Sequence, residues 1–246
     1  MTNGLPRSIG EVQAHRGASA VAPENTIAAF RAARDQGARW VELDVALLGD
    51  GTPVVIHDVT LERTTNGRGA LGELSIADLA GIDAGGWFGA QFAGEAFSTL
   101  PEVLEALGTL GLNVNVEIKQ HAHHKSLDQL IRTVHACLQD RPADVGVMIS
   151  SFDPQCLKAM HGLDPSYELA MLWGELPADW LEQVAAIPAS AIHLHYRALS
   201  FNILDRAREK GIVVRTWTCN EPAQMAPFWD EGLGGVITDN PSLFLG

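Results

Sequence analysis

The chain has very little cysteine. Its three cysteines, Cys137, Cys156 and Cys219, are an odd number, lie far apart and lack the paired spacing of a structural zinc site. This excludes a small domain held together by disulfides, and it predicts reduced thiols with a structural role.

Long hydrophobic runs are also missing. No uninterrupted apolar stretch approaches the roughly 18 residues that a membrane-spanning helix needs. Residues 1–10 contain one arginine and two glycines but no apolar segment like that of a secretory signal peptide. We therefore expect no membrane partner, and a cytoplasmic location as the default when export signals are absent.

Basic residues are scarce relative to acidic ones. The chain has 17 Lys and Arg residues and 30 Asp and Glu residues, which gives a formal net charge of −13. Such a chain should be repelled by nucleic acid and by anionic membrane surfaces. An anionic small molecule would need a local positive site, which a metal ion with Arg16 and Lys119 could supply.

The sequence does contain a regular alternation of strand-like and helix-like segments. Nine short apolar runs are candidate strands, at residues 12–15, 40–46, 53–57, 114–118, 145–150, 167–172, 191–194, 213–218 and 236–238. Most are continuously apolar, as expected for parallel strands buried on both faces. Over 246 residues this pattern predicts one α/β domain, residues 1–246, folded as a (β/α)8 TIM barrel.

The ninth candidate strand is one too many for such a barrel. Gly49-Asp50-Gly51 separates the second and third candidates and leaves no room for a helix between them. Either these two strands form a hairpin-like pair, or one short strand lies outside the closed barrel. The sequence allows both arrangements.

Two helix starts are predicted from capping residues. Asn25 can cap a helix that reaches about Gln36 and ends at Gly37. Asn220 can cap a later helix that contains residues 225–231.

Residues 59–98 interrupt the alternation. The stretch is polar and glycine-rich with one short helical pattern, and it is too long for a structureless loop inside a compact domain. We predict a small insertion after the third strand that stands over one end of the barrel. Four aromatic residues are expected to pack its own small core, with contact to substrate as the alternative: Trp87, Phe88, Phe92 and Phe97.

Polar residues end four consecutive strand candidates: His15, then Glu42 and Asp44, then His57, then Glu117. In TIM barrels the functional residues come from these C-terminal strand ends. Glu42 and Asp44 lie two apart on an extended strand, so both point to one face. Since buried carboxylates need a counter-charge, the three carboxylates predict a site for a hard divalent cation. The two histidines predict acid–base chemistry near neutral pH.

Other polar residues near this rim keep two interpretations. Asp58 either caps the turn into the insertion or orients a neighbouring group, and Glu24 could reach into the site from the start of the first helix. Trp217 ends a late strand and could form an apolar wall of the site. His195 lies near the same rim and could contact substrate.

Five polar motifs follow one another along the chain: His15-Arg16-Gly17, Pro23-Glu24-Asn25-Thr26, Glu42-Leu43-Asp44, His57-Asp58 and Glu117-Ile118-Lys119. In this order they resemble the glycerophosphodiester phosphodiesterases, and most closely the short cytoplasmic bacterial enzymes. The likeness covers essentially the whole chain, because it continues through Leu61-Glu62-Arg63-Thr64-Thr65-Asn66-Gly67, Ser150-Ser151-Phe152, Trp217-Thr218-Cys219-Asn220 and Thr238-Asp239.

The resemblance implies a metal-dependent hydrolysis and assigns roles to the rim residues. Glycerophosphodiesters such as glycerophosphocholine or glycerophosphoethanolamine would give sn-glycerol 3-phosphate and an alcohol. The family residues that match Glu42, Asp44 and Glu117 hold Mg²⁺ or Ca²⁺. The family residues that match His15 and His57 are the general acid and base. Those that match Arg16 and Lys119 face the phosphate. Which histidine is the acid, and whether the nucleophile is water or the substrate's own 2-hydroxyl group, stays open.

Other functions would use some of the same residues. A lysophospholipase D-like enzyme would apply this machinery to a lipid, but the acidic composition and the lack of a membrane segment argue against it. A TIM-barrel lyase would use Lys119 as a Schiff-base amine. A metal or sugar-phosphate binder without activity would need neither histidine. The sequence does not predict the oligomeric state.

Overall fold

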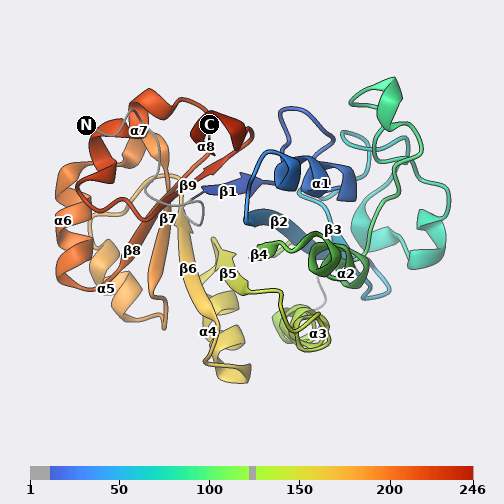
Figure 1. Ribbon diagram of the computed structural model, residues 1–246. Helices are drawn as coiled ribbons and strands as arrows, with labels where there is room; N and C mark the ends of the chain where they lie inside the picture. The colour runs from blue at the N-terminus through green and yellow to red at the C-terminus, as the bar shows by residue number, and fades with distance from the viewer. Residues whose placement is uncertain (1–11, 122–125, 246) are drawn as a thin grey trace.

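The structure is a computed structural model that describes residues 12–121 and 126–245 (Figure 1). The strands of the described part are β1 (Val12–His15), β2 (Trp40–Leu47), β3 (Pro53–Val55), β4 (Asn113–Ile118), β5 (Val147–Ser151), β6 (Glu168–Trp173), β7 (Ala191–His195), β8 (Val213–Trp217) and β9 (Gly235–Thr238). Residues 1–10, on which the expectation about export signals rests, lie outside it.

Eight of the described strands close into a parallel barrel. The order β1-β9-β8-β7-β6-β5-β4-β2 forms a circle because β1 also pairs with β2. The predicted (β/α)8 TIM barrel is therefore confirmed. β3 pairs antiparallel with β2 and lies outside the circle, so the extra strand is both a hairpin partner and external to the barrel.

Helices cover the outside of the barrel (Figure 1). They are α1 (Ile27–Asp35), α2 (Leu100–Leu110), α3 (Leu127–Gln139), α4 (Pro154–Leu163), α5 (Trp180–Ala185), α6 (Phe201–Glu209), α7 (Pro222–Trp229) and α8 (Ser242–Leu245). On β4, Val114 and Val116 pack outward against this helical layer, which leaves Asn115 and Glu117 on the inner face, where they line a cavity. Among the described residues no helix is long and apolar enough to cross a membrane.

Residues 59–98 lie beside the β2–β3 hairpin, at the right of Figure 1, and contain the short 3-10 helices η2 (Leu71–Glu73), η3 (Ile76–Leu79) and η4 (Ala90–Phe92). The hairpin turn binds this segment. The Gly49 N–H donates to the Leu71 carbonyl (2.9 Å), and Asp50 Oδ2 accepts from the Ile76 N–H (2.9 Å). A Cβ at position 49 would meet the Gly72 carbonyl oxygen at 2.3 Å, so the close approach requires glycine.

The apolar core of this segment is mainly aliphatic. Side chains of the hairpin and the insertion form one buried cluster: Ala46, Leu48, Val54, Ile56, Leu61, Leu71 and Leu79. Of the aromatic rings expected there, Phe97 packs against the cluster. The other three rings pack on one another, because Trp87–Phe88 and Phe88–Phe92 meet edge to face with centroids 5.6 Å apart. β2 and β3 already supply the aliphatic surface that the core needs.

Candidate active site

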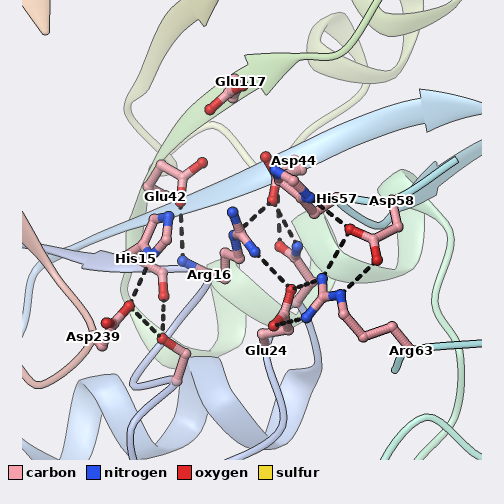
Figure 2. A network of polar contacts seen from close by, with 12 residues as sticks. His15, Arg16, Glu24, Glu42, Asp44, His57, Asp58, Arg63, Glu117 and Asp239 are labelled. Carbon is pink, nitrogen blue, oxygen red and sulfur yellow. Dashed lines mark hydrogen bonds and ion pairs between the residues drawn. The ribbon is translucent and has the colours of Figure 1, made fainter. Parts of the chain in front are cut away.

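Three carboxylates from two neighbouring strands converge at the mouth of the barrel (Figure 2). Glu42 and Asp44 lie on β2, and Glu117 on β4 is the register partner of Asp44. Their exposed fractions are 3%, 0% and 8%, and one oxygen of each lies within 4.8 Å of the others. Oxygens that share one Mg²⁺ or Ca²⁺ at about 2.0–2.6 Å are at most roughly 5 Å apart. The group could therefore hold a single divalent cation.

Arg16 and Lys119 both contact these carboxylates. Lys119 Nζ lies 3.0 Å from Asp44 Oδ1 and also contacts Glu117 Oε1. Arg16 Nε lies 3.1 Å from Asp44 Oδ2, and the Arg16 backbone N–H donates to Glu42 Oε2 (3.0 Å). Although burial opposes ionisation, Lys119 and then Arg16 hold the pKa of Asp44 below its usual range. The structure thus brings the predicted phosphate-facing cations and the predicted metal ligands together.

The two glutamates are less well compensated. Burial and the charge of Asp44 raise the pKa of Glu117 to about 7 and raise that of Glu42 well above its usual value. Glu42 Oε1 is buried and has no hydrogen-bond partner among the described residues. A buried carboxylate oxygen without a partner is costly unless a cation meets it, so the chemistry of this donor set fits a metal ion.

Both rim histidines are held through the same ring nitrogen. His15 Nδ1 lies 2.7 Å from Asp239 Oδ1, and His57 Nδ1 lies 2.7 Å from Asp58 Oδ1 (Figure 2). When Nδ1 carries the proton of such a bond, Nε2 keeps a free lone pair. Burial lowers the pKa of His57 despite the attraction of Asp44, which favours the neutral ring. Both rings line one cavity and can present Nε2 to a molecule there.

The cavity between the histidines has a volume of about 150 Å³ and one apolar side, formed by Phe152, Leu172, Trp217 and Ile237. Trp217 packs edge to face against Phe152 (centroids 5.6 Å apart) and against His195 (5.5 Å). Trp217 therefore lies where an apolar wall was expected. His195 supports Trp217 and is not part of the cavity lining that the described residues form.

Asn25 binds Asp44 instead of capping a helix. The N-cap of α1 is Thr26, whose Oγ1 accepts from the Ala29 N–H (3.2 Å), so the predicted cap is wrong by one residue. Asn25 Nδ2 donates to Asp44 Oδ2 (2.9 Å), and the Asp44 N–H donates to Asn25 Oδ1 (3.3 Å). Asn25 and Arg16 have positive φ angles of 58° and 55°. Such conformations are strained in residues other than glycine and occur where surrounding bonds over-determine them, often at functional sites.

Asp239 at the end of the last strand is a site residue to which the sequence patterns gave no role. Besides its contact with His15, it accepts hydrogen bonds from Ser19 Oγ (2.9 Å) and Asn220 Nδ2 (2.7 Å). Asn220 Oδ1 accepts from Thr238 Oγ1 and from the Asp239 N–H, so Asn220 is not the cap of α7, and that prediction is wrong. The usable signal was a polar pair, Thr238-Asp239, at the end of a barrel strand.

The remaining carboxylates near the rim also reach the site. Asp58 contacts the His57 ring, which shows the orienting role among its two interpretations. Glu24 Oε1 accepts from Arg16 Nη1 (2.8 Å). A possible cation site flanked by two oriented imidazoles and two basic side chains can stabilise negative charge on a phosphoryl group and transfer protons.

The sequence matches the glycerophosphoryl diester phosphodiesterase family over residues 15–243. A glycerophosphodiester phosphodiesterase of Caldanaerobacter subterraneus subsp. tengcongensis is 34% identical over 237 residues, which are 95% of this chain and 96% of that protein. A glycerophosphodiester phosphodiesterase of Bacillus subtilis is 32% identical over 247 residues, which cover 94% of this chain and 84% of that protein. The similarity is therefore not confined to the motifs.

Solved structures show the same similarity in three dimensions. A phosphodiesterase of Oleispira antarctica in complex with the product sn-glycerol-3-phosphate has a TM-score of 0.90 and 32% identity, covering 97% of this chain and 94% of that one. A glycerophosphodiester phosphodiesterase of Thermotoga maritima has a TM-score of 0.77 and 29% identity, covering 96% of each chain.

Proposed function

Because the chain belongs to the glycerophosphoryl diester phosphodiesterase family and is thus a phosphoric diester hydrolase, we propose that its substrates are small glycerophosphodiesters. Glycerophosphocholine and glycerophosphoethanolamine would each give sn-glycerol 3-phosphate and the free alcohol. The Oleispira antarctica relative, which was solved with that product, supports the assignment.

One observation carries the proposal. A single cavity is bordered by carboxylates that could share a cation and by two histidines, each bound through Nδ1 by a carboxylate. A binding protein would need the cation site but not two oriented proton-transfer groups. The combination is what hydrolysis of a phosphodiester requires.

In this proposal Glu42, Asp44 and Glu117 hold Mg²⁺ or Ca²⁺. The bound ion would supply positive charge next to the phosphoryl oxygens. Arg16 and Lys119 add positive charge from the protein itself, and both line the cavity. They stabilise the negative charge that accumulates on the phosphoryl oxygens as the reaction proceeds.

The two histidines move the protons. A neutral imidazole takes the proton of the attacking hydroxyl at Nε2 as the new P–O bond forms. The other, protonated imidazole gives its Nε2 proton to the alcohol oxygen as the old P–O bond breaks, so the proton count is conserved. Asp239 and Asp58 keep His15 and His57 in the orientation that points Nε2 into the cavity. Trp217 lies beside the glycerol or the leaving group.

An assay with glycerophosphocholine, coupled to detection of sn-glycerol 3-phosphate, tests this function. Turnover should disappear in EDTA and return with Mg²⁺ or Ca²⁺, and Glu42→Ala should abolish the cation-dependent turnover. Glu105→Ala is the matched control, because Glu105 is exposed on α2. Undiminished turnover in EDTA would contradict the metal site. Turnover of lysophosphatidylcholine without turnover of glycerophosphocholine would favour a lipid substrate instead.

A further inference from the structure

Arg63, in the segment of residues 59–98, bridges two carboxylates beside the active site (Figure 2). Its Nε and Nη2 lie 2.5 and 3.0 Å from the two oxygens of Asp58. Its Nη1 and Nη2 lie 2.7 and 2.8 Å from the two oxygens of Glu24. The guanidinium therefore uses two edges and makes paired hydrogen bonds with both carboxylates, the arrangement for which a planar fork of donors is suited.

Each of these carboxylates also holds a group of the active site. Asp58 Oδ1 lies 2.7 Å from His57 Nδ1, and Glu24 Oε1 lies 2.8 Å from Arg16 Nη1. One guanidinium thus connects the His57 ring to the Arg16 side chain. The connection joins the loop after β1, the segment after β3 and the insertion.

The backbone around Arg63 is well anchored, although the side chain itself is 45% exposed. Leu61 belongs to the buried aliphatic cluster, and Thr64 and Thr65 are 6% and 7% exposed. Thr65 Oγ1 donates to the Leu61 carbonyl (2.7 Å). The turn therefore presents Arg63 to the mouth of the barrel from a packed base.

We propose that Arg63 is a positioning residue, which fixes the side chains of Asp58 and Glu24 and, through them, the His57 ring and the Arg16 guanidinium. The inference rests on the proposed function, in which these two groups act on the phosphodiester. Without Arg63, the partly exposed Asp58 carboxylate can rotate into water and release the ring. Arg63 is also the main cause that holds the pKa of Asp58 at about 2, so Asp58 remains an ionised acceptor.

Kinetics of Arg63→Ala test this role. We expect kcat to fall about 10- to 100-fold, the cost found when outer hydrogen-bond partners of metal-binding side chains are removed, with a smaller change in KM. Millimolar guanidinium should restore part of the kcat of Arg63→Ala but none of that of His57→Ala. The kcat of Arg63→Lys should lie between the values of the unsubstituted protein and of Arg63→Ala, because an ammonium keeps the charge but cannot span both carboxylates. The matched control is Arg68→Ala, an exposed arginine of the same segment.

A second measurement needs no turnover. At about pH 8, above the ordinary histidine pKa of about 6.5, ¹⁵N NMR should show His57 with its proton on Nδ1. In Arg63→Ala the ring signals should move toward a mixture of both tautomers, whereas Arg68→Ala should leave them unchanged.

The results separate the two proposals. A kcat of Arg63→Ala equal to that of Arg68→Ala, or a fall in kcat without any change in the His57 ring signals, would overturn the positioning role. Lack of turnover by the unsubstituted protein would contradict the proposed function instead. The NMR comparison would then decide the role of Arg63 by itself.

Discussion

Replacing Asp239 with asparagine should disable His15 without disturbing the cation site. In the structure Asp239 receives three side-chain hydrogen bonds, from His15 Nδ1, Ser19 Oγ and Asn220 Nδ2. Asn220 cannot turn its oxygen toward the side chain at position 239, because that oxygen already accepts from Thr238 Oγ1 and from the backbone N–H of residue 239. The new amide must therefore place its own oxygen toward Asn220.

The amide NH₂ group then faces His15 and donates to Nδ1. The proton of the ring is forced onto Nε2, so the ring can no longer accept a proton from a nucleophile at that atom. If His15 acts as the acid, the loss of the carboxylate removes the charge that stabilises the imidazolium. General acid–base catalysis contributes typically 10²- to 10⁴-fold, so kcat should fall by about that factor, or about 3–5 kcal/mol in barrier height.

The assay is release of sn-glycerol 3-phosphate at saturating substrate and cation. Asp128→Asn is the control, because Asp128 forms an exposed ion pair with Arg132 on α3. KM and cation affinity of Asp239→Asn should change far less than kcat. A kcat within about twofold of the control value would refute the reasoning, since it would show that the orientation of His15 does not matter.

Three further predictions concern His57, the cation and stability at acid pH. His57→Ala should lower kcat by roughly 10²-fold or more, while calorimetric titration shows nearly unchanged Mg²⁺ binding; a near-normal kcat would contradict its role. Cation at about 100 times its Kd should stabilise the fold by about 2.7 kcal/mol and so raise Tm by about 5–10 °C. The rise in Tm should be absent in Glu117→Gln. No rise in Tm of the unsubstituted protein would contradict a resident cation. Hydrogen bonds from Arg63 hold the pKa of Asp58 at about 2, below about 3.9 for an unfolded aspartate. This carboxyl therefore contributes stability above about pH 4, and the contribution is lost as pH falls toward 2. Urea unfolding at pH 5 and pH 3 should show that the free energy of unfolding falls less in Asp58→Asn than in the unsubstituted protein. An equal fall in both would argue against the Asp58–Arg63 hydrogen bonds.

The barrel could be predicted because its strands carry a strong local signal. Strands buried on both faces are continuously apolar, and all nine candidate runs overlap the strands of the described residues. The role of β3 could not be predicted in the same way. β3 pairs with residues 45–47 of β2, on the edge opposite β4 and beyond residues 40–42, which pair with β1. Its place therefore depends on how far along β2 the pairing with β1 extends.

The carboxylate cluster was predictable for a related reason. Glu42 and Asp44 share a strand face by their spacing, and the C-terminal ends of parallel strands meet at one rim. The histidines follow from the same geometry. Their roles, and the occupancy of the site by a cation, stay predictions that the experiments above address.

The residues that hold the site in place were harder to predict. Asn25 precedes a helix and so has the same local signature as an N-cap, yet its partner Asp44 lies 19 positions away. Asn220 and Asp239 are likewise 19 positions apart, and Arg63 and Glu24 are 39 apart. Helix propensity and capping rules describe only neighbours along the chain, so they cannot identify contacts that the closed barrel creates.

Binding of one divalent cation by the Glu42, Asp44 and Glu117 group is the central claim. The most direct test is calorimetric titration of EDTA-treated protein with Mg²⁺ or Ca²⁺, with release of sn-glycerol 3-phosphate measured on the same samples. The account predicts one ion per chain, activity that rises in parallel with occupancy, and loss of both in Glu42→Ala. Full activity in protein that binds no ion would contradict it.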